Sequence, residues 1–271
     1  MSEQSDITAF RTADGLTIYG VSKARHAEIM RLLTQKYSLD TLQYCEAASY
    51  SMAMVIRHAL GAYAQDGKIM TIVCDSPAGQ IACAATRHLL NAGASVSLIV
   101  LGSGTATDNF NLQLNQLKTR GTDVVALHQS DLEKPATARD KIQASLADCH
   151  IAICGMFSWQ SVSNCGDHIV DALNESHVPT HSVIAPPGID PDTGARDSIA
   201  LYAASTLSLG VPLQGLSAGN DYAGRHFICD ISLPREILVD LVPKGQASLF
   251  SEQPVVRIFP YIAEQDQKDE Q

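Results

Sequence analysis

The sequence has little positive charge, few aromatic residues and no long apolar run. It carries 19 lysines and arginines against 29 aspartates and glutamates, so its 271 residues have a formal net charge of −10. Such acidity argues against broad binding to nucleic-acid phosphates or to an anionic lipid surface. No run approaches the roughly 20 apolar residues that a membrane-spanning helix needs. We therefore expect neither a membrane nor a nucleic-acid partner.

Several familiar site motifs are also missing. The chain has no Cys-x-x-Cys pair, no Gly-x-Gly-x-x-Gly sequence and no P-loop, and no metal site is expected. Its seven cysteines are an odd number, and four lie inside apolar segments, as reduced buried thiols do. Residues 1–8 are polar, with no basic start and no apolar stretch. These features predict a cytoplasmic, reducing location.

Strand-sized apolar segments alternate with helix-sized amphipathic ones in the middle of the chain. The predicted strands are 69–74, 96–101, 124–127, 150–154 and 180–184, and the predicted helices between them are 81–91, 109–120, 137–146 and 163–174. Two further helices, 21–37 and 42–64, precede the first strand. This alternation implies right-handed crossovers and a mostly parallel sheet covered on both faces. The predicted fold class is α/β, a three-layer Rossmann-like sandwich with two leading helices.

The alternation stops after residue 184. Prolines and glycines predict a loop over 185–196, followed by strands at 198–209 and 226–230, a short helix at 234–241 and an edge strand at 255–259. Residues 1–14 are predicted to be a loose lead-in. Because no linker rich in glycine, proline or serine divides the chain, residues 1–271 are predicted to form one domain. Its core spans about 20–242, and 260–271 form a C-terminal tail.

Ligands of such a sheet bind beyond the carboxyl ends of its strands. This rule selects the loops 74–80, 101–107, 154–164 and 185–192. In the first loop, Asp75, Ser76, Gly79 and Gln80 precede a helix whose free N–H groups could hold an anion. Only one glycine is present there and Asp75 would repel phosphate. An ordinary strand–helix turn is therefore the alternative.

Three residues are candidates for catalysis. Cys154 ends a strand beside the strand that ends in Cys74, so both thiols could face one cleft; a buried structural thiol is the alternative. His181 lies near the fourth loop, whereas most other histidines fall on predicted helices or strands. Asp190 offers a carboxylate within the fourth loop, although an aspartate in such a sequence commonly caps a turn.

Several stretches resemble YjeF N-terminal domains. Residues 187–194 (PGIDPDTG) resemble that family's P-S-G-[LI]-D-x-D-T-G loop, and 218–224 (AGNDYAG) followed by 230–234 (DISLP) resemble its A-G-x-x-Y-A-G…D-I-x-[IL]-P ending. Residues 87–93 resemble its A-R-H-L helix, and Glu46 lies where the family has M-E-N-A-G. The likeness covers about 20–242 in the same order.

The resemblance implies a Rossmann-like fold, a dimer and NAD(P)H-hydrate epimerisation as the family's best-known activity. The family also includes the C-terminal domain of the enhancer-of-mRNA-decapping proteins, which serves assembly. An RNA-associated role is not expected here, given the acidity of the chain and the absence of accessory domains. By the same resemblance, Pro187 and Gly188 join the four residues of the first loop as cofactor-contact candidates.

The sequence departs from the family's epimerase pattern at several positions. The phosphate loop G-N-N-G-G-D-G corresponds here to residues 75–82 (DSPAGQIA), in which only Gly79 is kept. Cys154 replaces an aspartate that helps hold potassium, and a soft thiol is a poor ligand for a hard cation. Ile184 replaces the catalytic aspartate. The catalytic lysine has no counterpart in 101–109.

These departures predict that the potassium site is lost. They also predict a non-epimerase that binds a nucleotide-like ligand or a partner as a homodimer. The alternative is an enzyme with a rebuilt site, including an active epimerase that uses relocated groups. The predicted helix 42–64 supports a dimer, because its apolar residues Tyr50, Met52, Met54, Val55 and Ile56 exceed one core-facing stripe. Burial on two sides within the monomer is the alternative.

Overall fold

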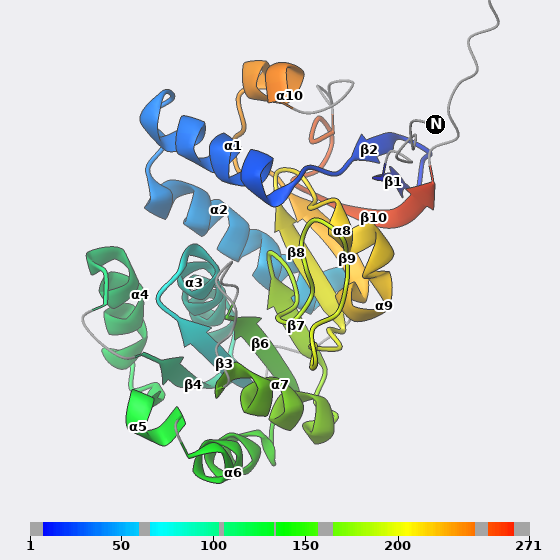
Figure 1. Cartoon of the computed structure of the whole chain (residues 1–271). Coiled ribbons are helices and arrows are strands. Elements are labelled where there is room, and N and C mark those ends of the chain that lie inside the picture. Colours follow the sequence, from blue (N-terminus) through cyan, green and yellow to red (C-terminus); the bar gives the residue numbers. More distant parts are fainter. Residues whose placement is uncertain are drawn as a thin grey trace, which may run out of the picture.

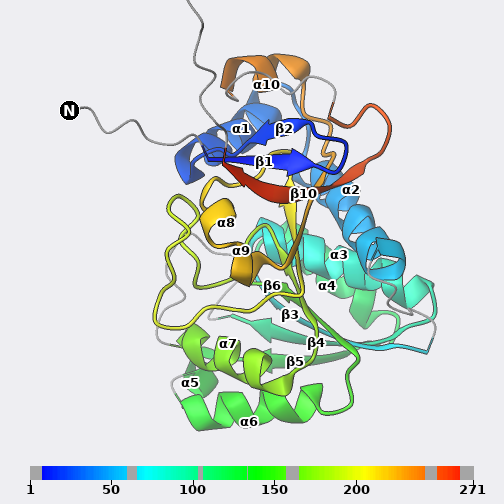
Figure 2. The same cartoon turned by 90° about the vertical axis from the view of Figure 1, so that its right-hand side faces the viewer.

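One ten-stranded sheet, in the order β2-β1-β10-β9-β8-β7-β6-β3-β4-β5, organises the chain (Figure 1). The computed structural model describes residues 8–59, 66–102, 106–132, 134–156, 165–241 and 249–262. Within these ranges no helix is long and apolar enough to cross a membrane. Helices cover both faces of the sheet (Figures 1 and 2), as a three-layer Rossmann-like α/β fold requires.

The parallel part of the sheet confirms the α/β prediction. Its seven strands are β3 (Lys68–Cys74), β4 (Ser95–Leu101), β5 (Asp123–Leu127), β6 (Ile151–Gly155), β7 (Thr180–Val183), β8 (Ser205–Leu209) and β9 (Arg225–Cys229). The helices between the first five are α3 (Pro77–Asn91), α4 (Asp108–Lys118), α5 (Gln129–Leu132), α6 (Pro135–Leu146) and α7 (Cys165–Ser176). Each predicted strand and helix of this region is present, with bounds shifted by a few residues.

An antiparallel extension, which the sequence did not predict, widens the sheet beyond β9. β1 (Thr8–Thr12) lies within the predicted lead-in and β2 (Thr17–Tyr19) follows it, and β10 (Val255–Ile262) pairs with both β1 and β9. The strand predicted at 255–259 is therefore present, but it lies inside the sheet and not at its edge. Residues 8–12 of the predicted lead-in and 260–262 of the predicted tail are strand, whereas 1–7 and 263–271 lie outside the described residues. The strand β1 is stabilised by β10, which follows it by more than 240 residues, and no local pattern reveals that pairing.

The two leading helices, α1 (Lys23–Gln35) and α2 (Thr41–Met54), are present, and Ser22 caps α1 as its position suggests. The second is shorter than predicted. It continues into a π-helical turn, η1 (Val55–Ala59), and 60–65 lie outside the described residues. Met52, Val55 and Ile56 are buried within the monomer. Because these three side chains are buried, most of the apolar surplus on which the dimer prediction depended is absent, and Tyr50, which is 53% exposed, is a remnant of it.

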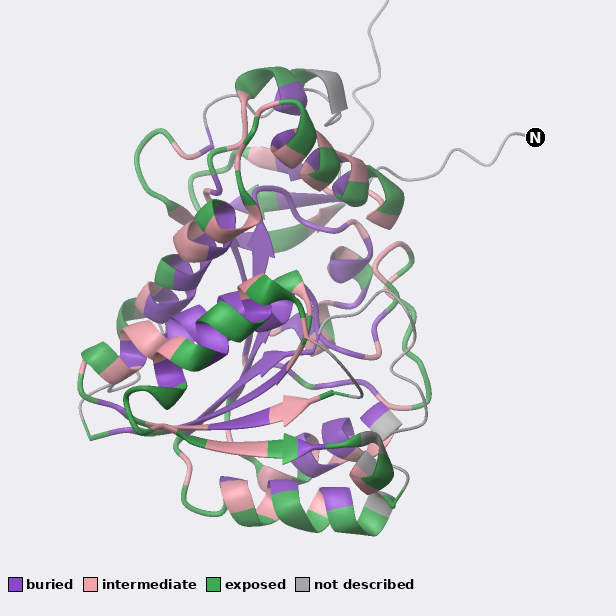
Figure 3. Ribbon diagram, turned by 90° about the vertical axis from the view of Figure 1, so that its left-hand side faces the viewer, coloured by how far each residue is buried: buried purple, intermediate pink, exposed green. Residues whose placement is uncertain are grey.

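Of three buried apolar clusters, the two largest lie one on each face of the sheet (Figure 3). On one face, Val73 and Ile153 pack with Ile81 of α3 and Phe110 of α4. On the other, β3 and β6 pack with α6 and α7 through a second apolar cluster that includes Ile72 and Cys154. The remaining short helices are α8 (Gly215–Ala218), α9 (Asn220–Ala223) and α10 (Arg235–Leu241). The segment 198–204, predicted as the start of a strand, is irregular.

Candidate functional site

The candidate site lies at the carboxyl ends of the central parallel strands. From β3 the chain proceeds outward to β4 and β5, and then returns to β6 and β7 on the other side of β3. The strand order therefore reverses between β3 and β6, which is where ligands of open α/β sheets bind. The loop after β3 and the loop 184–197 after β7 both begin at this edge.

The first loop is closed by its own hydrogen bonds. Ser76 is the N-cap of α3, and its Oγ accepts a hydrogen bond from the Gly79 N–H at 3.1 Å. Pro77 at the first helical turn has no N–H to offer. A Cβ on Gly79 would lie 1.9 Å from the carbonyl oxygen of Cys74, so glycine is required for the tight turn. Fewer free N–H groups remain for an anion than at an uncapped helix N-terminus.

The Asp75 carboxylate holds the next loop in place. Its two oxygens accept hydrogen bonds from the backbone N–H of Thr107 at 2.7 Å and from the Thr107 hydroxyl at 2.8 Å. Thr107 is in turn the N-cap of α4. Asp75 also lines a cavity of about 430 Å³ between the ends of β4 and β5 and helix α4, together with Val100, Leu101, Gly102, Ala106, Phe110, Leu114, Ala126, Leu127 and His128. The surface of this cavity is about equally polar and apolar, and its carboxylate disfavours a phosphate.

Gln80 and the nearby thiols lie in or at the edge of the core. The Gln80 side chain is buried, with its Oε1 4.0 Å from the Cys45 Sγ. The Cys74 Sγ lies 3.6 Å from the Ser76 Oγ and 3.7 Å from the Gly155 carbonyl oxygen. Burial raises the pKa of the Cys74 thiol. A thiol in this state is a weak nucleophile.

Cys154 lies on the face of the sheet that α6 and α7 cover. It is buried in the second apolar cluster with Ile72, Met156 and Ile169. Burial raises the pKa of Cys154 to about 12, so the side chain is a neutral thiol at physiological pH. These apolar surroundings are typical of a buried structural thiol, which was the alternative to a catalytic one. Its catalytic role stays a prediction.

His181 lies inside β7 and is buried. Its Nδ1 is 2.9 Å from the hydroxyl oxygen of Ser205 on the neighbouring strand β8. Burial lowers the pKa of His181 to about 4, which leaves the ring neutral near pH 7. The structure thus places this histidine in the sheet, three residues before Ile184, and does not bring it to Asp190.

The loop after β7 begins with an unusual backbone. Ile184 has a φ of +72°, which is rare for a β-branched residue. Its side chain is only 6% exposed and belongs to the apolar core. The Pro187 carbonyl accepts a hydrogen bond from the Leu201 N–H at 3.0 Å. Gly188 has a φ of +84°, and a Cβ there would lie 2.1 Å from the carbonyl oxygen of Ile199.

Asp190 and Asp192 stabilise this loop in different ways. The Asp190 Oδ1 accepts hydrogen bonds from the backbone N–H groups of Asp192 and Thr193 and from the Thr193 hydroxyl, at 3.0, 2.7 and 2.8 Å. These bonds lower the pKa of Asp190, because they favour its charged form. The Asp192 carboxylate accepts a hydrogen bond from Lys23 at the start of α1. Asp190 thus has the geometry of a turn cap, and its catalytic role stays a prediction.

Other polar contacts among the motif residues also hold the scaffold together. Glu46 on α2 accepts hydrogen bonds from the Nη2 of Arg87 at 2.7 and 2.6 Å, and its Oε1 lies 2.9 Å from the Nε2 of His88. This cluster joins α2 to α3. The part played by Thr107 and Lys23 was missed, because their partners lie 32 and 169 residues away along the chain. In the described part of the chain, no group of three or more histidine, cysteine or carboxylate residues is arranged to hold a metal.

Two short sequence patterns that the prediction did not use have no site geometry either. Residues 215–219 read Gly-Leu-Ser-Ala-Gly, which matches a nucleophile-elbow pattern. The Ser217 hydroxyl, however, donates a hydrogen bond to the carbonyl of Ala9, at 3.4 Å, from a four-residue helix. His177 and His181 are four residues apart, but the first is exposed and the second is buried inside a strand.

Comparisons with known proteins agree with this architecture. The model of the family described as YjeF-related protein N-terminus matches residues 41–215. The bifunctional NAD(P)H-hydrate repair enzyme Nnr of Moorella thermoacetica is 25% identical over 229 residues, which are 82% of this chain and 42% of the relative. Its counterpart from Salinibacter ruber is 26% identical over 216 residues, 77% of this chain and 40% of the relative. The chain therefore spans about two fifths of the length of these relatives.

One solved structure covers nearly the whole chain. The crystal structure of the yeast protein ynu0 (YNL200c) superposes with a TM-score of 0.72. The alignment covers 89% of this chain and 100% of the yeast chain, at 18% identity. At this level of identity the likeness supports the fold.

Proposed function

The chain belongs to the family of YjeF-related N-terminal domains, and on that premise we propose that it is a binding member that does not accelerate epimerisation of hydrated NADH or NADPH. The proposal starts from the relatives' name, NAD(P)H-hydrate repair enzyme. It places a nucleotide-like ligand or a protein partner at the carboxyl edge of the sheet. The sequence changes at this edge affect the groups that proton transfer requires.

The observation that carries the proposal is the environment of Ile184. The resemblance assigns this position to a catalytic carboxylate, and epimerisation needs a proton carrier within hydrogen-bond reach of the reacting group. Here the side chain is aliphatic, 6% exposed and packed in the core. Two of the three carboxylates that follow in the loop already accept hydrogen bonds, Asp190 within its own turn and Asp192 from the start of α1. Removal of one general acid or base typically costs 10²–10⁴-fold in rate.

The first loop supports the same conclusion. The family's glycine-rich phosphate loop is replaced by one in which Ser76 caps the helix and Pro77 removes an N–H. Asp75 presents a carboxylate at the adjoining cavity. A cofactor pyrophosphate would meet both fewer donors and a like charge.

Separation of the two epimers of hydrated NADH by chromatography over time, with stoichiometric protein, tests the proposal. We expect the exchange rate to equal the spontaneous rate. We expect Ile184→Asp to leave it unchanged, because the first loop is not restored. The Moorella relative, assayed in parallel, is the positive control. A hundredfold acceleration that Asp190→Asn abolishes would instead establish the rebuilt-site enzyme.

Calorimetric titration with adenine and nicotinamide nucleotides tests the ligand part of the proposal. We expect binding without turnover, weaker than that of the Moorella relative because the first loop offers fewer donors and a like charge. A variant in which Ser76→Trp blocks the edge of the sheet should bind more weakly still, provided that its melting temperature shows a folded chain without the Ser76 cap. Exposed Ser130→Trp is the matched control. Absence of binding heat would exclude nucleotides, and the partner-binding form of the proposal would then be tested by co-purification.

A further inference from the structure

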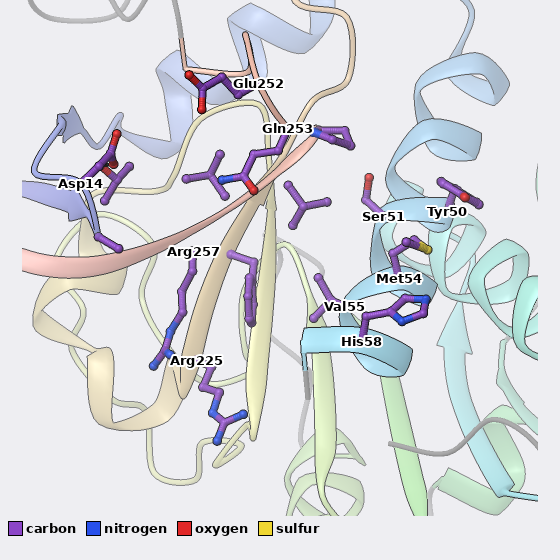
Figure 4. Close-up of a pocket in the computed structure, with 16 residues that line it drawn as sticks. Asp14, Tyr50, Ser51, Met54, Val55, His58, Arg225, Glu252, Gln253 and Arg257 are labelled. Carbon is purple, nitrogen blue, oxygen red and sulfur yellow. Dashed lines mark hydrogen bonds between the residues drawn. The ribbon is translucent and has the colours of Figure 1, made fainter. Parts of the chain in front are cut away.

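A second cavity lies away from the candidate site, between helix α2 and the antiparallel end of the sheet (Figure 4). Its volume is about 670 Å³, within the roughly 300–1,000 Å³ range of pockets that hold small molecules. One wall is formed by α2 and η1, and the other by β9 and β10, with the β1–β2 turn at one end. We call this cavity the α2–β10 groove; its lining residues are Thr12, Ala13, Asp14, Tyr50, Ser51, Met54, Val55, His58, Arg225, Phe227, Glu252, Gln253, Pro254, Val255, Val256 and Arg257.

Two arginines lie side by side at one end of the groove. Arg257 is paired in register with Phe227, and Arg225 lies two residues before Phe227 on the same strand. The two arginines are thus diagonal neighbours on one face of the sheet, at a spacing that lets long side chains meet. Figure 4 shows both side chains extending from the strands at the same end of the groove.

Neither arginine has a carboxylate partner among the residues that the structure describes. The guanidinium of Arg257 lies over the ring of Phe259, 4.7 Å from its centroid. No ion pair involves Arg225, although seven others are present elsewhere in the described chain. Two adjacent guanidinium groups offer paired N–H donors that match a carboxylate or a phosphate.

The two acidic residues of the groove, Glu252 and Asp14, lie apart from the arginines (Figure 4). Glu252 precedes Val255, which pairs with Cys229 at the far end of β9 from Arg225. Four residues of strand separate these ends, about 13 Å. Asp14 is at the β1–β2 turn, and its carboxylate accepts a hydrogen bond from the Thr12 hydroxyl. Figure 4 shows Asp14 and Glu252 well away from the two arginines.

Between the charged ends the groove is apolar. Phe227, Val255 and Pro254 line the sheet side, and Met54 and Val55 line the helix side. The helix side includes η1, a π-helical turn that contributes Val55 and His58. Such turns are rare and occur frequently at functional sites. A ligand with an apolar body of about a strand's length and an anionic end would therefore contact complementary surfaces in the groove.

We propose that the α2–β10 groove binds an amphipathic anion, an aliphatic chain with a terminal carboxylate or phosphate held by Arg225 and Arg257. The apolar part of the ligand lies along Val255, Pro254 and Met54. This site is separate from the carboxyl edge of the parallel strands, so its test does not depend on the outcome of the test of the proposed function. Carboxylate and phosphate share the chemistry that two arginines recognise, and the probes below separate them.

Isothermal titration calorimetry with decanoate, decyl phosphate, 1-decanol and inorganic phosphate tests the proposal. We expect decanoate or decyl phosphate to bind, with affinity rising about fourfold per buried methylene from hexanoate to decanoate. Decanol and inorganic phosphate should each bind at least tenfold more weakly. Equal binding of inorganic phosphate and decyl phosphate, no dependence on chain length, or no binding of either amphiphile would overturn the proposal.

Variants locate the binding to the groove. The double variant Arg225→Glu, Arg257→Glu should weaken decanoate binding at least tenfold. The matched control Arg31→Glu, Arg235→Glu, at exposed positions outside the groove, should change it less than twofold. Val255→Trp, which fills the groove, should abolish binding while the circular dichroism spectrum and melting temperature stay those of a folded chain. Equal affinities of the two double variants would contradict the proposal. The proposal would also be contradicted if the groove is the contact between two copies, that is, if the protein is a dimer that does not bind decanoate and the double charge reversal separates that dimer.

Discussion

The carboxylate of Asp192 accepts a hydrogen bond from the backbone N–H of Lys23, with 2.5 Å between Oδ1 and N. Lys23 is the first residue of α1, so the bond fastens the loop after β7 to a helix N-terminus 169 residues earlier in the chain. The helix dipole favours a negative charge at that position. Gln214 adds a second tie, because its side-chain amide donates to the carbonyl of Asp192 at 3.1 Å.

This relationship predicts the effect of removing the carboxylate. We expect Asp192→Ala to lower the free energy of unfolding by about 1–2 kcal/mol, as loss of a helix cap does. Urea denaturation followed by circular dichroism measures the change. Asp197→Ala is the matched control, because Asp197 is exposed in the same loop. Equal stabilities of the two variants would show that the Lys23 bond contributes nothing.

Alanine substitutions at Gly188 and Gly121 distinguish the cost of backbone strain from the cost of a steric clash. Their φ angles are close, +84° and +78°, but a Cβ at 188 would lie 2.1 Å from the Ile199 carbonyl, whereas nothing lies within 4 Å at 121. We expect Gly121→Ala to cost about 1–2 kcal/mol, the penalty of the left-handed conformation. Gly188→Ala should cost at least about 3 kcal/mol, because backbone must also move. Denaturant midpoints measure both, and similar costs would contradict the close packing of the loop.

Three buried histidines predict acid sensitivity. Burial lowers the pKa of His26 and of His181 to about 4 and that of His226 to about 3. Below the unfolded value of about 6.5, the unfolded chain binds protons that the folded chain does not. Stability is therefore full above pH 6.5 and falls as the pH drops toward 4, by about 1.4 kcal/mol per pH unit for each histidine.

Urea midpoints at several pH values between 7.5 and 4.5 measure this slope. His226→Gln should reduce the slope by about 1.4 kcal/mol per pH unit, the contribution of one proton, whereas exposed His128→Gln should leave the slope unchanged. His226 is a sensitive position because its Nε2 lies 2.8 Å from the Ser208 hydroxyl oxygen, while its buried Nδ1 has no hydrogen-bond partner among the described residues. A slope unchanged by His226→Gln would mean that this ring titrates alike in both states.

The chain should not respond to potassium. Cys154, which replaces the expected carboxylate ligand, is a buried neutral thiol whose pKa burial raises to about 12. A soft, uncharged sulfur in an apolar cluster does not replace the water oxygens of a hard cation. We expect the melting temperature to be the same in potassium chloride and in N-methylglucamine chloride of equal ionic strength. A stabilisation specific to potassium, with anomalous density near residue 154, would refute this.

Dimerisation stays a prediction. It now depends on the family resemblance, because Met52, Val55 and Ile56 of the helical segment that was expected to pair are buried within one chain. We expect light scattering at micromolar concentration to give twice the 29.0 kDa mass of one chain. A particle of 29.0 kDa would exclude the dimer.

Local sequence determined the elements of the parallel sheet. Strands and amphipathic helices differ in the spacing of their apolar residues along the chain, and that spacing can be recognised in the sequence without any tertiary contact. Ser22 at the start of α1 and Gly93 after α3, with its φ of +103°, act within one turn of their own helices. For that reason the α/β class and the order of the elements of the parallel sheet were predictable from the sequence.

Tertiary structure decided what each candidate residue does. Asp75 binds Thr107 and Asp192 binds Lys23 across 32 and 169 residues, and β1 pairs with β10 across most of the chain. A side chain's partner, its burial and hence its pKa depend on elements that only the folded packing brings together. The sequence therefore placed Cys154 at the end of a strand, but only the fold showed that it packs among apolar residues against α7.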